Sequence, residues 1–167
     1  MKLWIIRHAK SSWSEPGRSD FERPLNKRGE RDGPRMADWL ARQSHPAQWI
    51  WTSTAVRALA TAEFVRRGFG LTDAAVAAVD ELYHASPEDI LAIVRGTPSD
   101  IGSVAVVAHN PGLTSLVNLL GPSPATANLP TFGIARFDIP PSWQDLAPGT
   151  ATLDLLVAPK TIGQHRD

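Results

Sequence analysis

The 167-residue sequence contains no cysteine, which excludes disulfides, thiolate nucleophiles and cysteine-ligated metal sites. It also lacks net charge, with 17 basic and 17 acidic side chains. This balance argues against a nucleic-acid or membrane-surface binder, since such proteins carry a basic excess. No apolar run approaches the ~18 residues that span a bilayer, and the apolar start is too short for a signal peptide. We therefore expect a cytoplasmic protein with one domain over residues 1–160 and a tail over 161–167.

The charge balance is uneven along the chain. Residues 1–67 contain 13 Lys and Arg against 7 Asp and Glu, whereas residues 68–167 contain 4 against 10. An asymmetry of this kind can signal an anion site in the basic part of a chain, even where the whole chain is neutral.

Short apolar runs alternate with segments of helical spacing, a pattern that predicts an α/β protein. The expected strands are Leu3–Ile6, Trp49–Thr52, Ala75–Val79, Val104–Ala108, Ile134–Ile139 and Thr152–Val157. The expected helices run over about 26–43, 55–67, 87–94 and 112–120, with Ser-, Pro- and Gly-rich loops at 11–24 and 121–133. No clear helix separates the last two strands, so we expect them to include an antiparallel edge.

Proline and capping residues mark the helix starts. Ser86-Pro87 places a capping side chain before a first-turn proline, and Asn110-Pro111 repeats this arrangement. Pro34 lies inside the first expected helix, where it removes a backbone hydrogen bond. We therefore expect a kink or a restart of the helix at this residue.

The carboxyl ends of the first four expected strands carry side chains that suit catalysis. If these strands are parallel, their ends meet at the edge of the sheet where α/β proteins bind ligands. The four ends deliver Arg7-His8, Thr52–Thr54 with Arg57 close behind, Asp80-Glu81 and His109-Asn110. Two arginines, two histidines and a carboxylate are then expected at one edge.

Each of these side chains also has an ordinary structural explanation. A histidine after a strand is commonly a hydrogen-bonded loop residue, His109 can act as a helix cap, and Glu81 can be a solvated acid. Arg57 can be an exposed arginine that extends into solvent, but it is more informative, because the first turn of a helix disfavours a cation unless an anion binds there. The other three histidines, His45, His84 and His165, lack the spacing of metal ligands. We therefore assign no metal.

Five motifs occur in order: LWIIRHAKSSW (3–13), RPLNKRG (23–29), TSTAVRALATAE (52–63), ELYHAS (81–86) and VVAHNPGL (106–113). Together they resemble the histidine phosphatase superfamily, and more narrowly its SixA-type phosphohistidine phosphatase branch. The resemblance implies a phosphoglycerate-mutase-like, three-layer α/β/α sandwich with a mostly parallel sheet. It implies that His8 accepts the phosphoryl group and that Glu81 donates a proton. The implied phosphate pocket consists of Arg7, Arg57 and His109.

Phosphoryl-transfer chemistry agrees with these roles. The phosphoryl group carries charge on its equatorial oxygens during transfer, and arginine binds such oxygens in bidentate fashion. His8 must keep one ring nitrogen unprotonated to attack phosphorus. We expect a backbone carbonyl to hold the other nitrogen and so fix the tautomer. Water would then hydrolyse the phosphohistidine intermediate, and no cofactor is expected.

The substrate class is predicted from a missing insertion and two substitutions. Few residues separate the second helix from Glu81, which leaves no room for a lid. We therefore expect an open pocket that receives a phosphohistidine presented by a phosphotransfer domain. Ser14 stands where mutase-like members more often have asparagine, and Ala9 stands where most of the superfamily has glycine. By resemblance, both differences favour the SixA-type branch. Only Ser11 is added to the residues implied to bind substrate.

Two other functions remain open. One is a broad phosphomonoesterase acting on small phosphate esters, and the other is a phosphate-binding module without turnover. The presence of both His8 and Glu81 argues against the module, because anion binding needs neither a nucleophile nor an acid. We expect a monomer that binds neither nucleic acid nor membrane.

Overall fold

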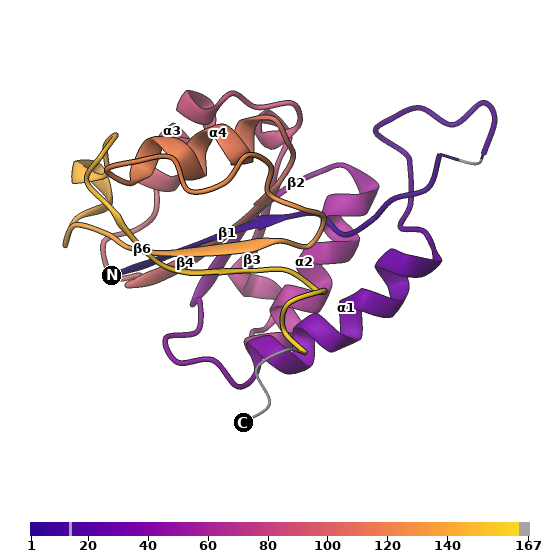
Figure 1. Ribbon diagram of the computed structural model, residues 1–167, viewed down its shortest axis with the longest axis horizontal. Helices are drawn as coiled ribbons and strands as arrows, with labels where there is room; N and C mark the ends of the chain where they lie inside the picture. The colour runs from indigo at the N-terminus through magenta and orange to yellow at the C-terminus, as the bar shows by residue number, and fades with distance from the viewer. Residues whose placement is uncertain (14, 164–167) are drawn as a thin grey trace.

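The computed structural model describes residues 1–13 and 15–163, so Ser14, His165 and the end of the expected tail lie outside the described residues. Within them, a six-stranded sheet lies between two layers of helices (Figure 1). The strands are β1 Lys2–Arg7, β2 Trp49–Ser53, β3 Val76–Val79, β4 Ser103–Ala108, β5 Ile134–Asp138 and β6 Thr152–Val157. The helices are α1 Lys27–Leu40, α2 Val56–Gly68, α3 Pro87–Arg95 and α4 Gly112–Leu120.

The first four strands are parallel and the last two are not. Their order across the sheet is β3-β2-β4-β1-β5-β6. β5 runs antiparallel to β1, and β6 runs antiparallel to β5. The predicted α/β class and its antiparallel edge are therefore confirmed. Because β1, β2, β3 and β4 are parallel, their carboxyl ends lie along the same edge of the sheet.

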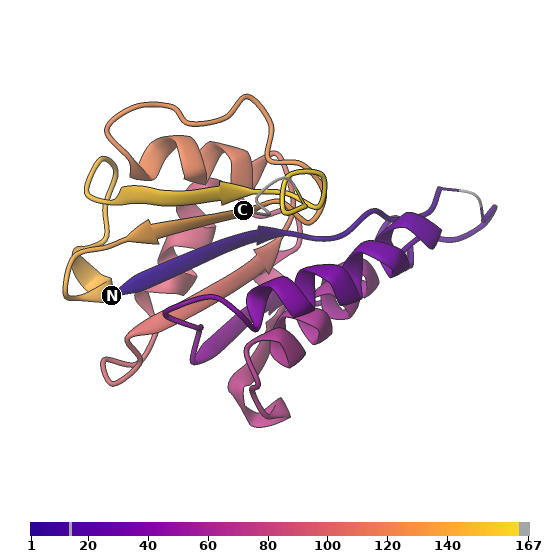
Figure 2. The ribbon, with the colours of Figure 1, turned by 60° about the horizontal axis from the view of Figure 1, so that its bottom comes forward.

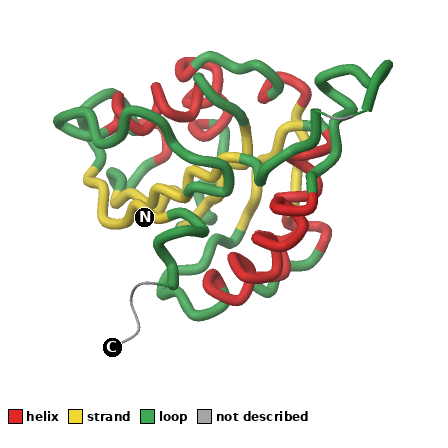
Figure 3. The backbone as a smooth tube through the Cα atoms, turned by 45° about the vertical axis from the view of Figure 1, so that its right-hand side comes forward, coloured by secondary structure: helices red, strands yellow, loops and turns green. Residues whose placement is uncertain are grey.

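Alternating side chains of the central strands form a core on each face of the sheet. In β1, Leu3 and Ile5 belong to the core under α3 and α4, whereas Trp4 and Ile6 belong to the core under α1 and α2. Figure 2 shows α1 and α2 packed side by side against the sheet, and Figure 3 shows the strands at the centre with helices outside. Every residue of β4 is buried, because both faces of this strand are covered.

Helix α1 is continuous through its internal proline. It begins after Asn26, whose Oδ1 accepts a hydrogen bond from the Gly29 N–H at 2.9 Å. The helix does not restart at Pro34, so that part of the prediction is wrong. Pro34 and Glu30 are both exposed, and the Glu30 carbonyl that loses its helical partner can bind water instead.

The starts of α3 and α4 follow the capping signals with one difference. Ser86 caps α3 as predicted. In α4, Pro111 is the N-cap and Gly112 is the first helical residue, so the predicted first-turn position of this proline is wrong. Asn110 still caps the helix, because its Oδ1 accepts hydrogen bonds from the N–H and hydroxyl of Thr114, deeper in the first turn.

The segment between β1 and α1 projects beyond the carboxyl edge of the sheet, at the upper right of Figure 1. Its base is tied by a hydrogen bond from the Asn26 N–H to the Lys10 carbonyl. A Cβ on Gly29 would collide with that same carbonyl oxygen. The glycine of the RPLNKRG motif therefore allows α1 to approach the end of β1 closely.

The connection from α2 to α3 contains only short elements. Two single-turn 3-10 helices, Asp73–Ala75 and Asp80–Leu82, flank β3 in this stretch. No inserted segment covers the sheet edge from this side within the described residues, as the sequence predicts. Among the same residues, no helix is long and apolar enough to cross a membrane.

Candidate active site

Four of the predicted site residues meet at the carboxyl edge of the parallel strands. Arg7 ends β1 and His8 follows it, Arg57 lies in the first turn of α2, and His109 follows β4. His8, Arg57 and His109 are only 7%, 3% and 5% exposed. The centroids of the His8 and His109 rings are 5.2 Å apart, and Arg57 donates a hydrogen bond to His8. The cluster is therefore a buried site rather than a set of surface charges.

The His8 ring is held with one nitrogen free of a proton. Its Nδ1 lies 2.8 Å from the Ala9 carbonyl oxygen, so Nδ1–H donates to this oxygen and Nε2 keeps its lone pair. Arg57 Nε–H donates to His8 Nε2 at 3.3 Å, which requires the same tautomer. The carbonyl expected to hold the ring is therefore that of the next residue, Ala9.

Thr61 ties the loop that carries His8 to the helix that carries Arg57. The Ala9 N–H donates to Thr61 Oγ1 at 2.9 Å, and the Thr61 hydroxyl donates to the Arg57 carbonyl at 2.7 Å. The His8 N–H donates to the Ala108 carbonyl at the end of β4. These bonds position His8 against both α2 and the neighbouring strand.

Burial keeps both histidines of the cluster neutral at physiological pH. Burial, helped by the charges of Arg57 and Arg7, lowers the pKa of His8 to about 4, although the hydrogen bond to Ala9 opposes this shift. Burial also lowers the pKa of His109 to about 3, and the neighbouring His8 and Arg57 add to the effect. A neutral ring is what nucleophilic attack by histidine requires.

We expect the His8 and His109 rings to remain unprotonated as the pH falls from about 8 to about 5, because their lowered pKa values of about 4 and about 3 favour the neutral form. An NMR titration of the imidazole carbon-bound protons measures both midpoints. The variants His8→Asn and His109→Asn assign the two signals. The same chain unfolded in urea should titrate near 6.5 and serves as the reference. A native His8 midpoint at or above the unfolded one would contradict the prediction.

The carboxylate at the centre of the site is one that the sequence pattern did not indicate. Asp20 Oδ2 accepts hydrogen bonds from Arg57 Nη2 at 3.0 Å and from the Tyr83 hydroxyl at 2.6 Å. The Asp20 carbonyl accepts another from Arg57 Nη1 at 2.6 Å, and Asp20 Oδ1 pairs with Arg23 Nη2 at 2.9 Å. Asp20 therefore fixes the direction of the Arg57 guanidinium.

Asp20 is ionised in this network. Burial opposes its ionisation, but the Tyr83 hydrogen bond and the charge of Arg57 outweigh burial and hold the pKa of the Asp20 carboxyl well below its usual range. The pKa of Tyr83 is raised in turn, by burial first and then by Asp20. The one sequence signal for Asp20 was its position three residues before Arg23 of the RPLNKRG motif.

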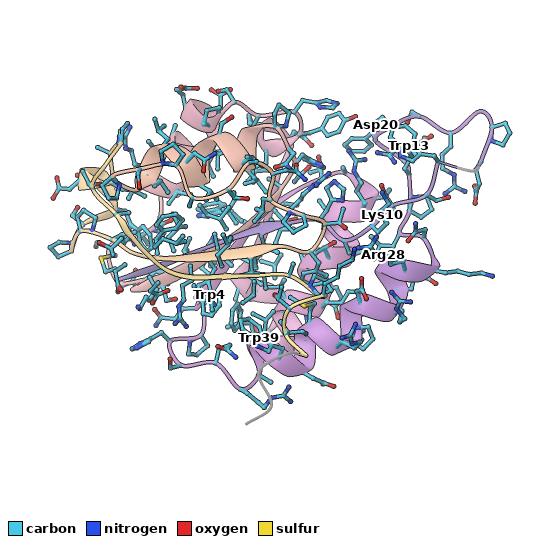
Figure 4. All side chains as sticks on the ribbon, in the orientation of Figure 1. Trp4, Lys10, Trp13, Asp20, Arg28 and Trp39 are labelled. Atoms are coloured by element: carbon cyan, nitrogen blue, oxygen red, sulfur yellow. The ribbon has the colours of Figure 1, made fainter. Side chains whose placement is uncertain are left out.

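Arg23 links Asp20 to the first half of the projecting segment, and Trp13 and Asp20, both labelled in Figure 4, line the same small hollow with Arg23. Arg23 Nη1 donates to Ser11 Oγ at 2.9 Å, and its guanidinium carbon lies 3.4 Å from the centroid of the Trp13 ring, which is 75% exposed. Among the described residues, no hydrogen bond joins Ser11 to the His8 cluster. Ser11 therefore supports Arg23 in this state, and its binding of substrate stays a prediction.

Two buried polar atoms at the site have no hydrogen-bond partner among the described residues. They are Arg7 Nε and His109 Nδ1. Arg7 Nη1 donates to the Leu129 carbonyl at 2.9 Å, and His109 Nε2 lies 2.7 Å from Ser53 Oγ. Buried polar groups without partners cost free energy. Arg7 Nε can only donate, so it indicates a ligand that supplies an acceptor, such as an oxyanion. His109 Nδ1 can donate to the same ligand in the tautomer whose Nε2 accepts from Ser53.

Glu81 is not joined to the other predicted residues. It is exposed in the turn Asp80–Leu82 and makes no side-chain hydrogen bond or ion pair within residues 1–13 and 15–163. Its neighbours Tyr83 and His84 approach the site instead, with ring centroids 5.5 and 6.4 Å from that of His109. The role of Glu81 as proton donor stays a prediction. Nor do three or more potential metal ligands gather anywhere in the described part of the chain.

Known proteins match both the sequence and the fold. The sequence model of the Histidine phosphatase superfamily (branch 1) matches residues 3–90. Uncharacterized protein Rv1276c of Mycobacterium tuberculosis is 31% identical over 157 residues, covering 89% of this chain and 96% of that protein. A structure assigned as phosphohistidine phosphatase SixA from Nakamurella multipartitia has a TM-score of 0.81 at 27% identity, covering 95% of both chains. The protein histidine phosphatase SixA complexed with tungstate has a TM-score of 0.80 at 25% identity, covering 97% of this chain and 99% of that one. These likenesses confirm the phosphoglycerate-mutase-like three-layer fold.

Proposed function

The chain belongs to the histidine phosphatase superfamily and to its SixA-type branch, and we propose that it removes phosphoryl groups from protein phosphohistidine through a covalent intermediate on His8. The observation that carries this proposal is the state of the His8 ring. Its Nε2 is unprotonated and lies 3.3 Å from Arg57 Nε. Two buried atoms of the same cluster, Arg7 Nε and His109 Nδ1, have no hydrogen-bond partner in the described part of the chain. A neutral nucleophile beside cationic donors suits attack on an anionic phosphorus.

The pocket residues support the binding of one phosphoryl group. Arg7 Nε is a cationic donor, and Arg57 adds its guanidinium. Ser53 Oγ accepts the Ala55 N–H at 3.2 Å and can donate its own proton to His109 Nε2, which leaves the ring proton on Nδ1 as a further donor. The SixA structure that contains tungstate holds an oxyanion with the tetrahedral shape of phosphate.

The proposed reaction has two displacement steps. His8 Nε2 attacks phosphorus in line, while the bond from phosphorus to the substrate nitrogen breaks and its electron pair goes to the leaving imidazole. Arg57 then donates to the phosphoryl oxygens with Arg7 rather than to the ring of His8. In the second step, water attacks phosphorus, the bond to His8 Nε2 breaks and phosphate leaves. No cofactor enters either step.

Phosphohistidine as the substrate is supported by the likeness to SixA structures and by the short connection between α2 and α3, which leaves that side of the site uncovered. A second candidate is a phosphomonoesterase for small esters. The burial of His8, which is only 7% exposed, favours it, because a small ester reaches a buried ring more easily than a side chain attached to a protein does.

A substrate panel separates these two functions. We expect kcat/KM for a phosphohistidine-bearing phosphotransfer protein to exceed that for p-nitrophenyl phosphate and a sugar phosphate by ~10²-fold or more. The physical reason is that a protein substrate adds contacts outside the pocket, and an imidazole leaving group needs less help than an alkoxide. Phosphate release is measured for each substrate, with His8→Asn as the control for contaminating phosphatases.

Two results would overturn the substrate assignment. Faster hydrolysis of the small esters would assign the chain as a phosphomonoesterase. Phosphate binding without turnover of any substrate would leave only a phosphate-binding module.

A further inference from the structure

His84 lies at the edge of the site and has no part in the phosphate pocket. Its side chain is 65% exposed, and its Nε2 is 3.6 Å from Asp20 Oδ2. Its ring lies against Tyr83 at a centroid distance of 4.0 Å and faces His109 at 6.4 Å. A histidine in this position is accessible to solvent and adjacent to the buried cluster at the same time.

His84 has an unfavourable backbone conformation, which the surrounding structure must hold. Its φ angle is 55°, in the left-handed region that residues other than glycine rarely adopt and that persists only where the surroundings impose it. The next carbonyl, of Ala85, lies so close to Gly112 that a Cβ on this glycine would collide with it. The absence of a side chain at Gly112 therefore lets the His84 segment pack against the start of α4, beside His109.

A surface hollow of about 320 Å³ joins His84 to the cluster. Both His84 and His109 line it, together with the starts of α3 and α4. A leaving group or a water molecule in this hollow would contact the exposed ring of His84 and the buried ring of His109 together. The hollow therefore places His84 and His109, one of the predicted pocket residues, beside the same solvent-filled space.

The other polar groups at the site are poorly placed to supply a proton. Asp20 is ionised, and the Tyr83 hydroxyl already donates to it. Glu81 is exposed, and its side chain makes no hydrogen bond or ion pair with the cluster among the described residues. His109 is neutral and bonded to Ser53. His84 combines access to solvent, an imidazole ring and a carboxylate 3.6 Å away, that of Asp20.

We propose that His84 donates the proton to the leaving group, an inference that rests on the proposed function of His8. As the bond from His8 Nε2 to phosphorus forms, the bond to the leaving group breaks, and its electron pair takes the proton of the His84 imidazolium. In the second step the neutral His84 accepts a proton from water as the water oxygen bonds to phosphorus. The bond to His8 then breaks and its electron pair returns to Nε2. One turnover restores the protonation of both rings.

The variant His84→Asn tests this role with little disturbance of the backbone, because asparagine tolerates the left-handed region. We expect kcat for alkyl phosphates to fall by ~10²-fold, whereas kcat for p-nitrophenyl phosphate falls by less than ~3-fold because nitrophenolate leaves without protonation. His45→Asn is the matched control, since His45 is also exposed and has a φ of 60°. It should leave both rates unchanged.

Equal losses on both classes of ester, or no loss on either, would overturn the role of His84. A loss confined to alkyl phosphates in Glu81→Gln, with none in His84→Asn, would assign the proton donor to Glu81 instead. Including His8→Asn in the same series distinguishes failure of the proposed function on His8 from failure of the proposed role of His84. If His8→Asn stays active, the function on His8 fails. If it is inactive while His84→Asn is unselective, the inference on His84 alone fails.

Discussion

Replacing His8 by asparagine is expected to abolish the covalent phosphoenzyme and to lower kcat by ~10⁴-fold or more. The asparagine amide can still donate to the Ala9 carbonyl, but it has no lone pair in the place of the His8 Nε2 that faces Arg57. The pocket can therefore still bind an anion and cannot accept a phosphoryl group. Loss of activity with retained phosphate binding is the signature that distinguishes a missing nucleophile from a collapsed site.

The measurement is incubation with a labelled small phosphodonor, followed by acid and base treatment of the denatured protein. Wild type should carry label that is lost in acid and kept in base, as expected for phosphohistidine, and His8→Asn should carry none. His45→Asn controls for the general effect of removing a histidine, because His45 is exposed. Label of the same stability in His8→Asn would place the covalent site on another residue.

Replacing Arg57 by lysine is expected to lower kcat/KM by ~10²- to 10³-fold, in the range found when a donor to transition-state charge is removed. Arg57 makes three contacts at once: with His8 Nε2, with the Asp20 carbonyl and with the Asp20 carboxylate. A lysine ammonium keeps the charge but cannot hold these partners in a plane or bind two phosphoryl oxygens together. The loss of kcat/KM in Arg57→Lys therefore measures the contribution of the guanidinium geometry rather than that of its charge.

The measurement pairs steady-state kinetics with calorimetric binding of tungstate as a phosphate analogue. Arg67→Lys is the matched control, because Arg67 lies at the other end of α2, is exposed and pairs with Glu63. It should leave kcat/KM unchanged. A loss of less than ~10-fold in Arg57→Lys would show that the charge alone accounts for its contribution.

Features that depend on neighbouring residues in the sequence could largely be predicted: the positions of the strands and the importance of Arg57. The apolar and β-branched runs located all six strands to within one residue at each end. The signal is strongest in β4, where every residue is buried, and weaker in β5 and β6, which include charged residues. Arg57 stood out because a cation in the first turn of a helix opposes the helix dipole. The structure places it beside His8, where an anion would remove this conflict.

The roles of residues that contact partners far away in the sequence could not be predicted from local patterns. Asp20 and Arg57 are 37 positions apart, and the one local signal, the spacing of Asp20 from Arg23, does not show that this carboxylate orients the Arg57 guanidinium. The carboxylate suggested by position, Glu81, follows the end of β3 as expected, yet it is exposed. The end of a strand determines the backbone position of the residues that follow it. The contacts of their side chains depend on which loops pack over that edge of the sheet.

The missing cysteine and the balanced charge of the sequence by themselves exclude whole classes of chemistry, and the ordered motifs determine the family and fold of this protein. The family and its fold follow from the resemblance of the motifs, whereas hydrophobic periodicity and capping predict the individual strands and helices, because both depend on near neighbours. Only the tertiary structure decided that Asp20 anchors Arg57 beside His8, in the basic first part of the chain. It also decided that Gly29 and Gly112 permit close backbone approaches. These features depend on packing between segments distant in sequence, which no local pattern encodes.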